Sequence, residues 1–250
     1  FDDLDVLPYP AHDLLGNIPF VPVLTSLGCV FRCTYCATPY MYKKMVRRSP
    51  GSVLDEIAHW HDRGVGRFVV YDDSFLYSSE NFAKPLLRSI ARLPYRIRIY
   101  NPNAVNAAFI DGEMADLFVR SGFREVRIGL ESIDPLVQSS TGGKVTRATF
   151  ERAVKILKEA GYGPEQMSVY ILAGLPRQDW RDVKRAIDYV RSLDATPYLA
   201  EYTPIPHTPM FDEFKDLARF PVSADAVYQN NAVFPYAWEG FTEDDLNWLK

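Results

Sequence analysis

Three cysteines, the only ones in the 250-residue chain, stand close together in the segment GCVFRCTYCATPY. They are Cys29, Cys33 and Cys36, so three residues separate the first pair and two separate the second. Buried structural cysteines are usually scattered over a core, and an odd, tightly spaced set does not form a disulfide framework. Thiolates bind soft metals such as zinc, copper(I) and the iron of iron–sulfur clusters. The spacing therefore predicts a metal-binding loop.

The number of thiols distinguishes two kinds of metal site. A structural zinc ion takes four protein ligands, and the four histidines of the chain show no zinc-like spacing from the cysteines. An iron–sulfur cluster held by three cysteines keeps one iron without a protein thiolate, and that iron can bind a substrate or a cofactor. The incomplete ligand set favours an iron–sulfur cluster with a role in catalysis. A zinc-stabilised fold and three inert thiols remain as alternatives.

The elements that must position this loop alternate along the chain, short β-branched or aromatic segments with longer amphipathic ones. The predicted strands are Val21–Ser26, Arg67–Tyr71, Arg96–Tyr100, Glu125–Gly129, Ser168–Ala173 and Tyr198–Tyr202. The predicted helices are Pro50–Asp62, Ser79–Arg92, Asp111–Ser121, Thr146–Ala160 and Asp179–Leu193, with a late helix that opens at Thr242. Six such βα units indicate an α/β fold, with a parallel sheet that forms an open or partial barrel.

Composition and charge exclude several classes of protein. The hydrophobic content of 47%, the charged content of 24% and the net charge of -4 are typical of a globular protein without a broad basic face for nucleic acid. No apolar run is long enough for a membrane span, and the amino end shows no signal peptide pattern. We therefore expect a cytoplasmic protein, where a reducing environment keeps such thiols free for metal.

The loop CVFRCTYC, with Tyr35 directly before the third cysteine, resembles the signature of the radical S-adenosylmethionine (radical SAM) superfamily. The resemblance implies a [4Fe-4S] cluster on the three cysteines, with SAM chelating the fourth iron. It implies reductive cleavage of SAM to a 5′-deoxyadenosyl radical that attacks a small-molecule substrate. It further implies an oxygen-sensitive enzyme, a reductant such as flavodoxin or ferredoxin, and a partial (β/α)6 TIM-like barrel, in agreement with the six units.

Further segments resemble the class of this family that is commonly associated with a cobalamin-binding domain, which includes the magnesium-protoporphyrin ester cyclase and various methylases. The segment VVYDDSF stands where the family usually has a Gly-Gly-Glu stretch that binds the SAM ammonium group. IGLES, YILAGLP and YTPIPHTPM resemble later strand ends of the class, although Tyr170 and Arg177 depart from its pattern. The cofactor-binding residues implied by the resemblance are Tyr35, Asp72, Asp73, Ser74, Glu131, Leu172, Gly174 and Pro204.

The resemblance also divides the chain into three parts. Residues 1–17 are expected to be a linker that follows a cobalamin-binding domain absent from this sequence, residues 18–210 the radical SAM barrel, and residues 211–250 a short irregular C-terminal extension. Cobalamin supplied from such a domain would support methyl transfer. The sequence does not identify catalytic residues, and the candidates near predicted strand ends are Tyr100, Tyr170, Tyr202 and His207. The alternative function is a non-catalytic module that binds the cluster and SAM or carries electrons.

Overall fold

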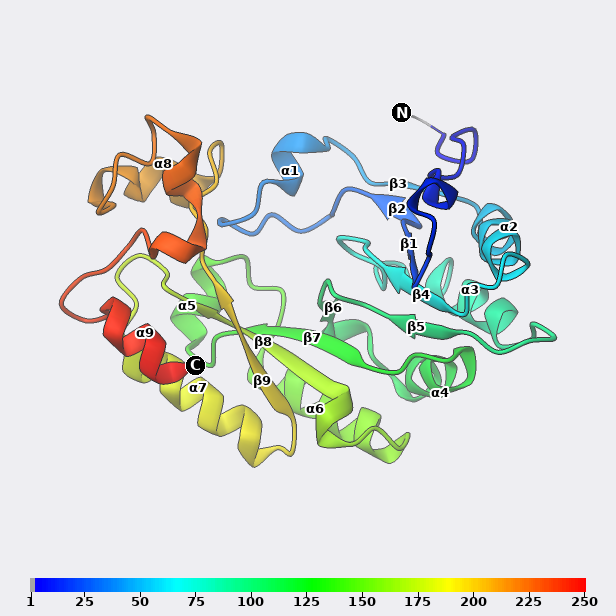
Figure 1. Ribbon diagram of the computed structural model, residues 1–250. Coiled ribbons are helices and arrows are strands. Elements are labelled where there is room, and N and C mark those ends of the chain that lie inside the picture. Colours follow the sequence, from blue (N-terminus) through cyan, green and yellow to red (C-terminus); the bar gives the residue numbers. More distant parts are fainter. Residues whose placement is uncertain (1–2) are drawn as a thin grey trace.

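A computed structural model describes residues 3–250 and shows a curved parallel sheet with helices along one side (Figure 1). The main strands lie side by side in chain order, namely β1 (Val21–Val23), β4 (Arg67–Val70), β5 (Arg98–Tyr100), β7 (Val126–Glu131), β8 (Met167–Ala173) and β9 (Thr196–Glu201). All their pairings are parallel, and a bridge between Ile99 and Phe123 joins β5 to the segment that enters β7. In the described part of the chain β9 does not pair with β1, so the barrel is open. The predicted fold class is confirmed.

Three short strands complete the sheet structure. β6 (Val105–Asn106) continues the path of β5 and pairs with β7. β2 (Ser26–Leu27) and β3 (Val46–Arg47) form an antiparallel pair that encloses the cysteine loop between them in sequence. The first predicted strand, Val21–Ser26, is therefore divided, because the chain leaves β1 at Leu24 and turns into β2. This break lets the cysteine loop leave the barrel and return to it.

The helices follow the strands as the sequence pattern predicts. The longer ones are α2 (Pro50–His61), α3 (Ala83–Ile90), α4 (Gly112–Ser121), α6 (Arg147–Glu159) and α7 (Trp180–Ser192). The short ones are α1 (Thr38–Met41), α5 (Pro135–Ser140), α8 (Pro209–Phe214) and α9 (Glu243–Leu249). Side chains of Ser49, Asp111, Thr146 and Asp179 accept hydrogen bonds from the first turns of four helices, as N-caps do. The helix predicted from Ser79 begins only at Ala83, because residues 79–82 form turns.

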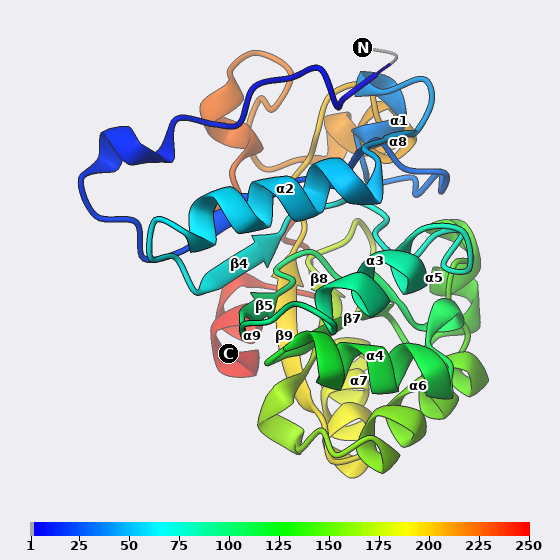
Figure 2. The same ribbon diagram turned by 90° about the vertical axis from the view of Figure 1, so that its right-hand side faces the viewer.

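Burial separates the two faces of the sheet. Phe68, Ile99, Ile128 and Val169 alternate with more exposed neighbours on their strands and are buried against the helices. Figure 2 shows α2, α3 and α4 on this outer side, and α3 contacts both α2 and α4. One face of the sheet thus carries the core, and α2, α3 and α4 pack on that face.

The last forty residues pack back onto the barrel. Phe241 and Tyr236 are buried, and the indole N–H of Trp238 donates a hydrogen bond to the backbone oxygen of Gln178 at 3.1 Å. α9 lies beside α7 in Figure 1 and contacts it. The C-terminal extension therefore shares the core of the barrel, while the predicted division of the chain into three parts stays a prediction. No helix within residues 3–250 is long and apolar enough to cross a membrane.

A candidate cofactor site at the carboxyl ends of the strands

The three cysteines line one small cavity of about 100 Å³. All three thiols are free, Cys33 is buried, and Cys29 and Cys36 are partly exposed. A turn brings the second and third cysteine together, since the Cys36 N–H donates to the Cys33 oxygen at 3.1 Å. The cavity continues past Tyr35, Asp73 and further residues that follow β4, β5 and β7. The predicted metal-binding loop thus opens onto the end of the barrel where such folds place their active sites.

Contacts from distant parts of the chain hold the cysteine loop in place. The Thr34 hydroxyl donates to the Ser140 oxygen at 3.1 Å, and the Met210 N–H donates to the Thr34 oxygen at 3.0 Å. Gly142 lies against Cys33 so closely that a Cβ atom at Gly142 would be 3.1 Å from the Cys33 Cα and 3.2 Å from its Sγ. The end of α5 and the start of α8 therefore hold the loop between them.

Asp72 and Asp73 follow β4 but make different contacts. Asp72 is buried, and its carboxylate accepts hydrogen bonds from the backbone N–H groups of Thr25 (2.7 Å) and Ser26 (3.1 Å) and from the Thr25 hydroxyl. Asp73 and Ser74 line the cysteine cavity. Of the predicted pair, Asp73 is therefore the one placed to meet a cofactor. The predicted contact of Asp72 with SAM stays a prediction, but protein donors occupy its oxygens.

Glu131 and Lys144 form an ion pair at the edge of the same cavity. The Lys144 Nζ lies 2.6 Å from the Glu131 Oε1 and 6.0 Å from the centre of the Tyr35 ring. Glu131 has a φ of 67° and lies where the pairing of β7 with β8 shifts its register. Burial disfavours the charged amine, but the attraction of Glu131 and Cys33 outweighs it and raises the pKa of Lys144. The site thus contains a retained positive charge beside the thiols.

Sequence reasoning missed Lys144 and Gln178. Lys144 stands in a Gly-Gly-Lys segment thirteen residues after Glu131, and no local pattern indicates that the two side chains pair. The buried Gln178 accepts hydrogen bonds from the N–H groups of Gly174 (2.8 Å) and Leu175 (3.1 Å) and donates to the Leu172 oxygen at 2.9 Å. It therefore shapes the loop after β8.

Leu172, Gly174 and Pro204 lie apart from the cysteines. Among the described residues that line the cysteine cavity none of these three occurs. Leu172 belongs to a second apolar cluster with Tyr202, Met210 and Tyr236, and Tyr35 packs against that cluster from the side of the cysteines. Gly174 has a φ of 82°, and a Cβ atom there would be 2.7 Å from the ring of Phe234. The extension thus covers Gly174, one of the residues for which the resemblance implies contact with a cofactor.

The four candidate catalytic residues are not brought together. The Tyr170 hydroxyl donates to the Pro102 oxygen at 2.8 Å, whereas His207 is exposed and stacks on Tyr40 with ring centres 4.1 Å apart. Tyr202 is buried in the second apolar cluster, and Tyr100 is the last residue of β5. The described lining of the cysteine cavity includes none of the four, so their catalytic roles stay predictions.

The donor set consists of three free thiols, the ligand type that holds iron–sulfur clusters. Within residues 3–250 no three histidine, cysteine or acidic side chains converge closely enough for one metal ion. Burial raises the pKa of the Cys29 thiol, against a hydrogen bond from the Phe31 N–H, and burial likewise raises the pKa of Cys33 against the attraction of Lys144. Metal binding would therefore have to displace protons from these thiols.

A family model described as the Radical SAM superfamily matches residues 23–190, which is more than half of the chain. The chain belongs to the radical SAM superfamily. The match includes the cysteine loop, Asp73 and Lys144, so the predicted family is confirmed on the part of the chain that forms the site.

Curated relatives of this radical SAM chain include methyltransferases and a cyclase. The bacteriochlorophyllide d C-12(1)-methyltransferase of Chlorobaculum tepidum is 30% identical over 205 residues, which covers 80% of this chain and 43% of the relative. The anaerobic magnesium-protoporphyrin IX monomethyl ester cyclase of Cereibacter sphaeroides is 27% identical over 210 residues, which covers 82% of this chain and 33% of the relative. The chain thus spans less than half the length of these relatives.

Solved structures agree with the fold and with the predicted class. The radical S-adenosylmethionine methyltransferase TsrM from Kitasatospora setae, with cobalamin and a [4Fe-4S] cluster bound, superposes with a TM-score of 0.70 at 28% identity. The match covers 79% of this radical SAM chain and 39% of TsrM. The predicted similarity to cobalamin-associated members of the family is therefore confirmed.

Proposed function

We propose that this chain is the catalytic barrel of an enzyme that binds a [4Fe-4S] cluster and cleaves SAM reductively. The observation that carries the proposal is one cavity lined together by Cys29, Cys33, Cys36, Asp73 and Lys144. It combines a cluster-type ligand set with one negative and one positive side chain. An amino acid group carries the same two charges, so the cavity complements the methionine end of SAM.

Different residues of the cavity bind the cluster and the two charged groups of SAM. The three cysteines hold the cluster, which when bound supplies the electron that cleaves SAM to methionine and a 5′-deoxyadenosyl radical. Asp73 accepts hydrogen bonds from the ammonium group of SAM, and Lys144 donates to its carboxylate. Glu131 fixes Lys144 through their ion pair. Tyr35 separates the cavity from the apolar cluster around Leu172, where the rest of SAM would be covered by apolar side chains.

The test is anaerobic reconstitution with iron and sulfide, followed by dithionite and SAM. We expect a brown protein that forms 5′-deoxyadenosine, and Asp73→Asn and Lys144→Met variants that keep the cluster but bind SAM more weakly. Should the two variants bind SAM as the parent does, the alternative of an electron-carrying module would replace the proposal. Zinc without iron in protein purified without oxygen would instead indicate a zinc-stabilised barrel.

A second candidate reaction is methyl transfer with cobalamin. It is favoured by the names of the relatives, since TsrM binds cobalamin and the Chlorobaculum tepidum relative is a methyltransferase. The cobalamin-binding domain would lie outside this sequence, before a linker at residues 1–17 and a barrel at residues 18–210. Addition of methylcobalamin and SAM to the longer native protein would then yield a methylated product, whereas cyclase-type chemistry would not.

The proposed cluster also indicates a compartment and an electron donor for the enzyme. Because such a cluster with an open iron is destroyed by oxygen, we place the protein in the cytoplasm with flavodoxin or ferredoxin as the reductant. The substrate is a small molecule, as in the TsrM structure that holds tryptophan and a SAM analogue.

A further inference from the structure

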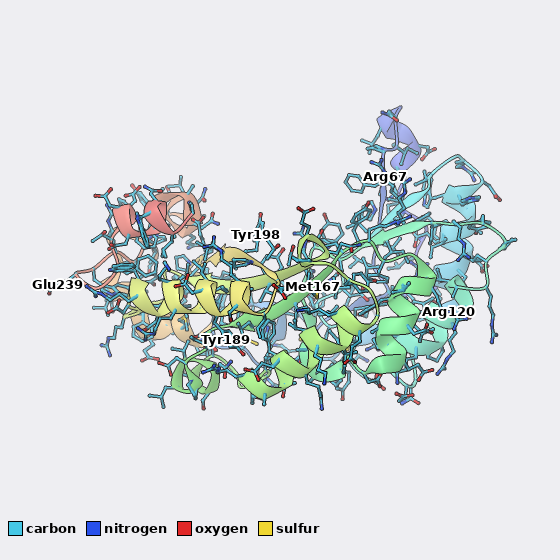
Figure 3. The ribbon with its side chains drawn as sticks, turned by 90° about the horizontal axis from the view of Figure 1, so that it is seen from below. Arg67, Arg120, Met167, Tyr189, Tyr198 and Glu239 are labelled. Atoms are coloured by element: carbon cyan, nitrogen blue, oxygen red, sulfur yellow. The ribbon has the colours of Figure 1, made fainter. Side chains whose placement is uncertain are left out.

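The inner face of the sheet carries charged and aromatic side chains where the outer face carries the core. Figure 3 shows α4 with Arg120 and α7 with Tyr189 on one side of the sheet and Arg67 and Tyr198 on the other. Arg67 and Arg98 alternate with the buried Phe68 and Ile99, so they point away from the core and are exposed. The helices α4 and α7 lie on the opposite face.

Two of these side chains are arginines that stand next to each other. Arg67 and Arg98 are direct partners in the register of β4 and β5, and neighbouring strands lie about 4.8 Å apart. Neither guanidinium has a hydrogen bond or an ion pair among the described residues 3–250. Like charges directly opposite each other are unfavourable in a sheet. An anion that bound both guanidinium groups would remove this repulsion.

Farther along the same face Tyr170 and Tyr198 form a fixed aromatic surface. Their rings meet edge to face with centres 5.3 Å apart, and the Arg127 guanidinium lies 5.7 Å from the centre of the Tyr198 ring. Arg127 donates to the Tyr170 hydroxyl at 2.8 Å and to Glu125 at 2.8 Å, so its own charge is already paired. Tyr198 is 52% exposed. One ring is therefore held in place and open for another ring to stack on it.

The length of the strands sets the size of a molecule that reaches from the arginines to the cysteine cavity. Arg67 begins β4, and Asp73, six positions later, lines the cavity. At about 3.3 Å per residue, this separation is at most ~20 Å. A ligand that bridges it has to be extended, with its acidic group far from the atom that reacts.

We propose that the inner face binds the substrate, and that the substrate is an extended anion with a flat ring system. Arg67 and Arg98 bind its oxyanion, a carboxylate or a phosphate, and Tyr198 stacks on its ring. This inference rests on the proposed function for the reacting end, which lies at the cysteine cavity. Arg67, Arg98 and Tyr198 determine which class of substrate the enzyme accepts.

The test is fluorescence anisotropy with reconstituted protein and three pyrene probes, namely pyrene-1-butyrate, 1-pyrenyl phosphate and the neutral pyrene-1-butanol. We expect at least one anionic probe to bind about tenfold more tightly than the alcohol, which corresponds to about one charge-assisted pair. The probe that binds more tightly distinguishes a carboxylate from a phosphate. The double variant Arg67→Gln/Arg98→Gln should reduce the affinity for that anion to the level of the alcohol. Tyr198→Ala should lower the affinity for all three probes.

The control is Arg152→Gln, an exposed arginine on α6 on the helix side, which should change nothing. Equal binding of anions and alcohol, or full anion affinity in the double variant, would overturn the proposal. Absence of binding by all three probes would also overturn the proposal. If the double variant then altered the sedimentation coefficient, a second copy of the chain would be the molecule that covers this face. Formation of 5′-deoxyadenosine without added substrate should be the same in Arg152→Gln as in the parent protein. A parent protein that forms no 5′-deoxyadenosine would refute the proposed function and not the anion site.

Discussion

The carboxylate of Asp72 accepts a hydrogen bond of 2.7 Å from the backbone N–H of Thr25 and joins the end of β4 to the segment that enters the cysteine loop. The same carboxylate also accepts the N–H of Ser26. A fixed distance between these two strand ends matters for the site, because the first cysteine, Cys29, stands only three residues after Ser26. Asp72 thus positions the loop, while its neighbour Asp73 faces the cavity.

Asp72→Ala should lower the free energy of unfolding by about 2–4 kcal/mol, because it leaves the N–H groups of Thr25 and Ser26 buried without an acceptor. Urea unfolding of cluster-free protein measures the effect. The control is Asp116→Ala on the exposed side of α4, which should change the value by less than about 0.5 kcal/mol. Equal losses in the two variants would contradict the role of Asp72.

The same carboxylate should make stability depend on pH. Burial outweighs the hydrogen bonds from Thr25 and Ser26 and raises the pKa of Asp72 to about 6, above its ordinary value of 3.8. The folded protein therefore holds the proton more tightly, so this contribution is complete below pH 3.8 and is lost as the pH rises through 6. The stability of the parent relative to Asp72→Asn should fall by about 2 kcal/mol between about pH 4.5 and about pH 7 in urea unfolding. A difference that is constant or grows with pH would show that Asp72 is not desolvated.

Lys144→Met should weaken SAM binding about tenfold or more, because one charge-assisted hydrogen bond contributes about 1.5–3 kcal/mol. Equilibrium dialysis with the reconstituted protein measures the dissociation constant, and the iron content should be unchanged. Lys158→Met is the control, since Lys158 pairs with Asp194 at the surface of α6. If Lys144→Met lost the cluster and kept its affinity for SAM, Lys144 would serve the loop and not the cofactor.

Gly142→Ala should reduce the iron bound per chain after reconstitution. The added Cβ atom would come within 3.2 Å of the Cys33 Sγ and displace that thiol. Gly143 is the matched comparison, because it also has a positive φ but no heavy atom within 4 Å of an added Cβ. Iron content of the Gly143→Ala variant should remain close to that of the parent. Equal losses in both variants would indicate backbone strain and not contact with Cys33.

The elements of the fold were predictable because their signals are local. Ser49 before Pro50 and Asp111 before α4 are N-caps that act within one turn, and both helices begin where the sequence indicates. The break of the first strand after Val23 was not predictable, since it depends on the antiparallel pairing of Ser26 with Arg47. Likewise, α8 extends to Phe214, into the C-terminal extension that was predicted to be irregular.

The site was predictable in its ligands but not in its electrostatics. The cysteines are close in sequence, so their spacing alone predicts a shared metal. The different positions of Asp72 and Asp73 follow from the alternation of side chains along β4. Phe68, Val70 and Asp72 lie on one face and are all buried. The Lys144 pair and the cover of Gly174 by Phe234 join segments far apart in sequence, and no local pattern encodes them.

The most direct test of the account is the electron paramagnetic resonance spectrum of the reconstituted, dithionite-reduced protein with and without SAM, together with its iron and sulfide content. We predict about four iron and four sulfide per chain, and a spectrum that SAM alters because it binds the iron that no cysteine holds. The Lys144→Met variant should need more SAM for the same change. A spectrum indifferent to saturating SAM, or a chain that holds zinc and no sulfide, would contradict the central claim.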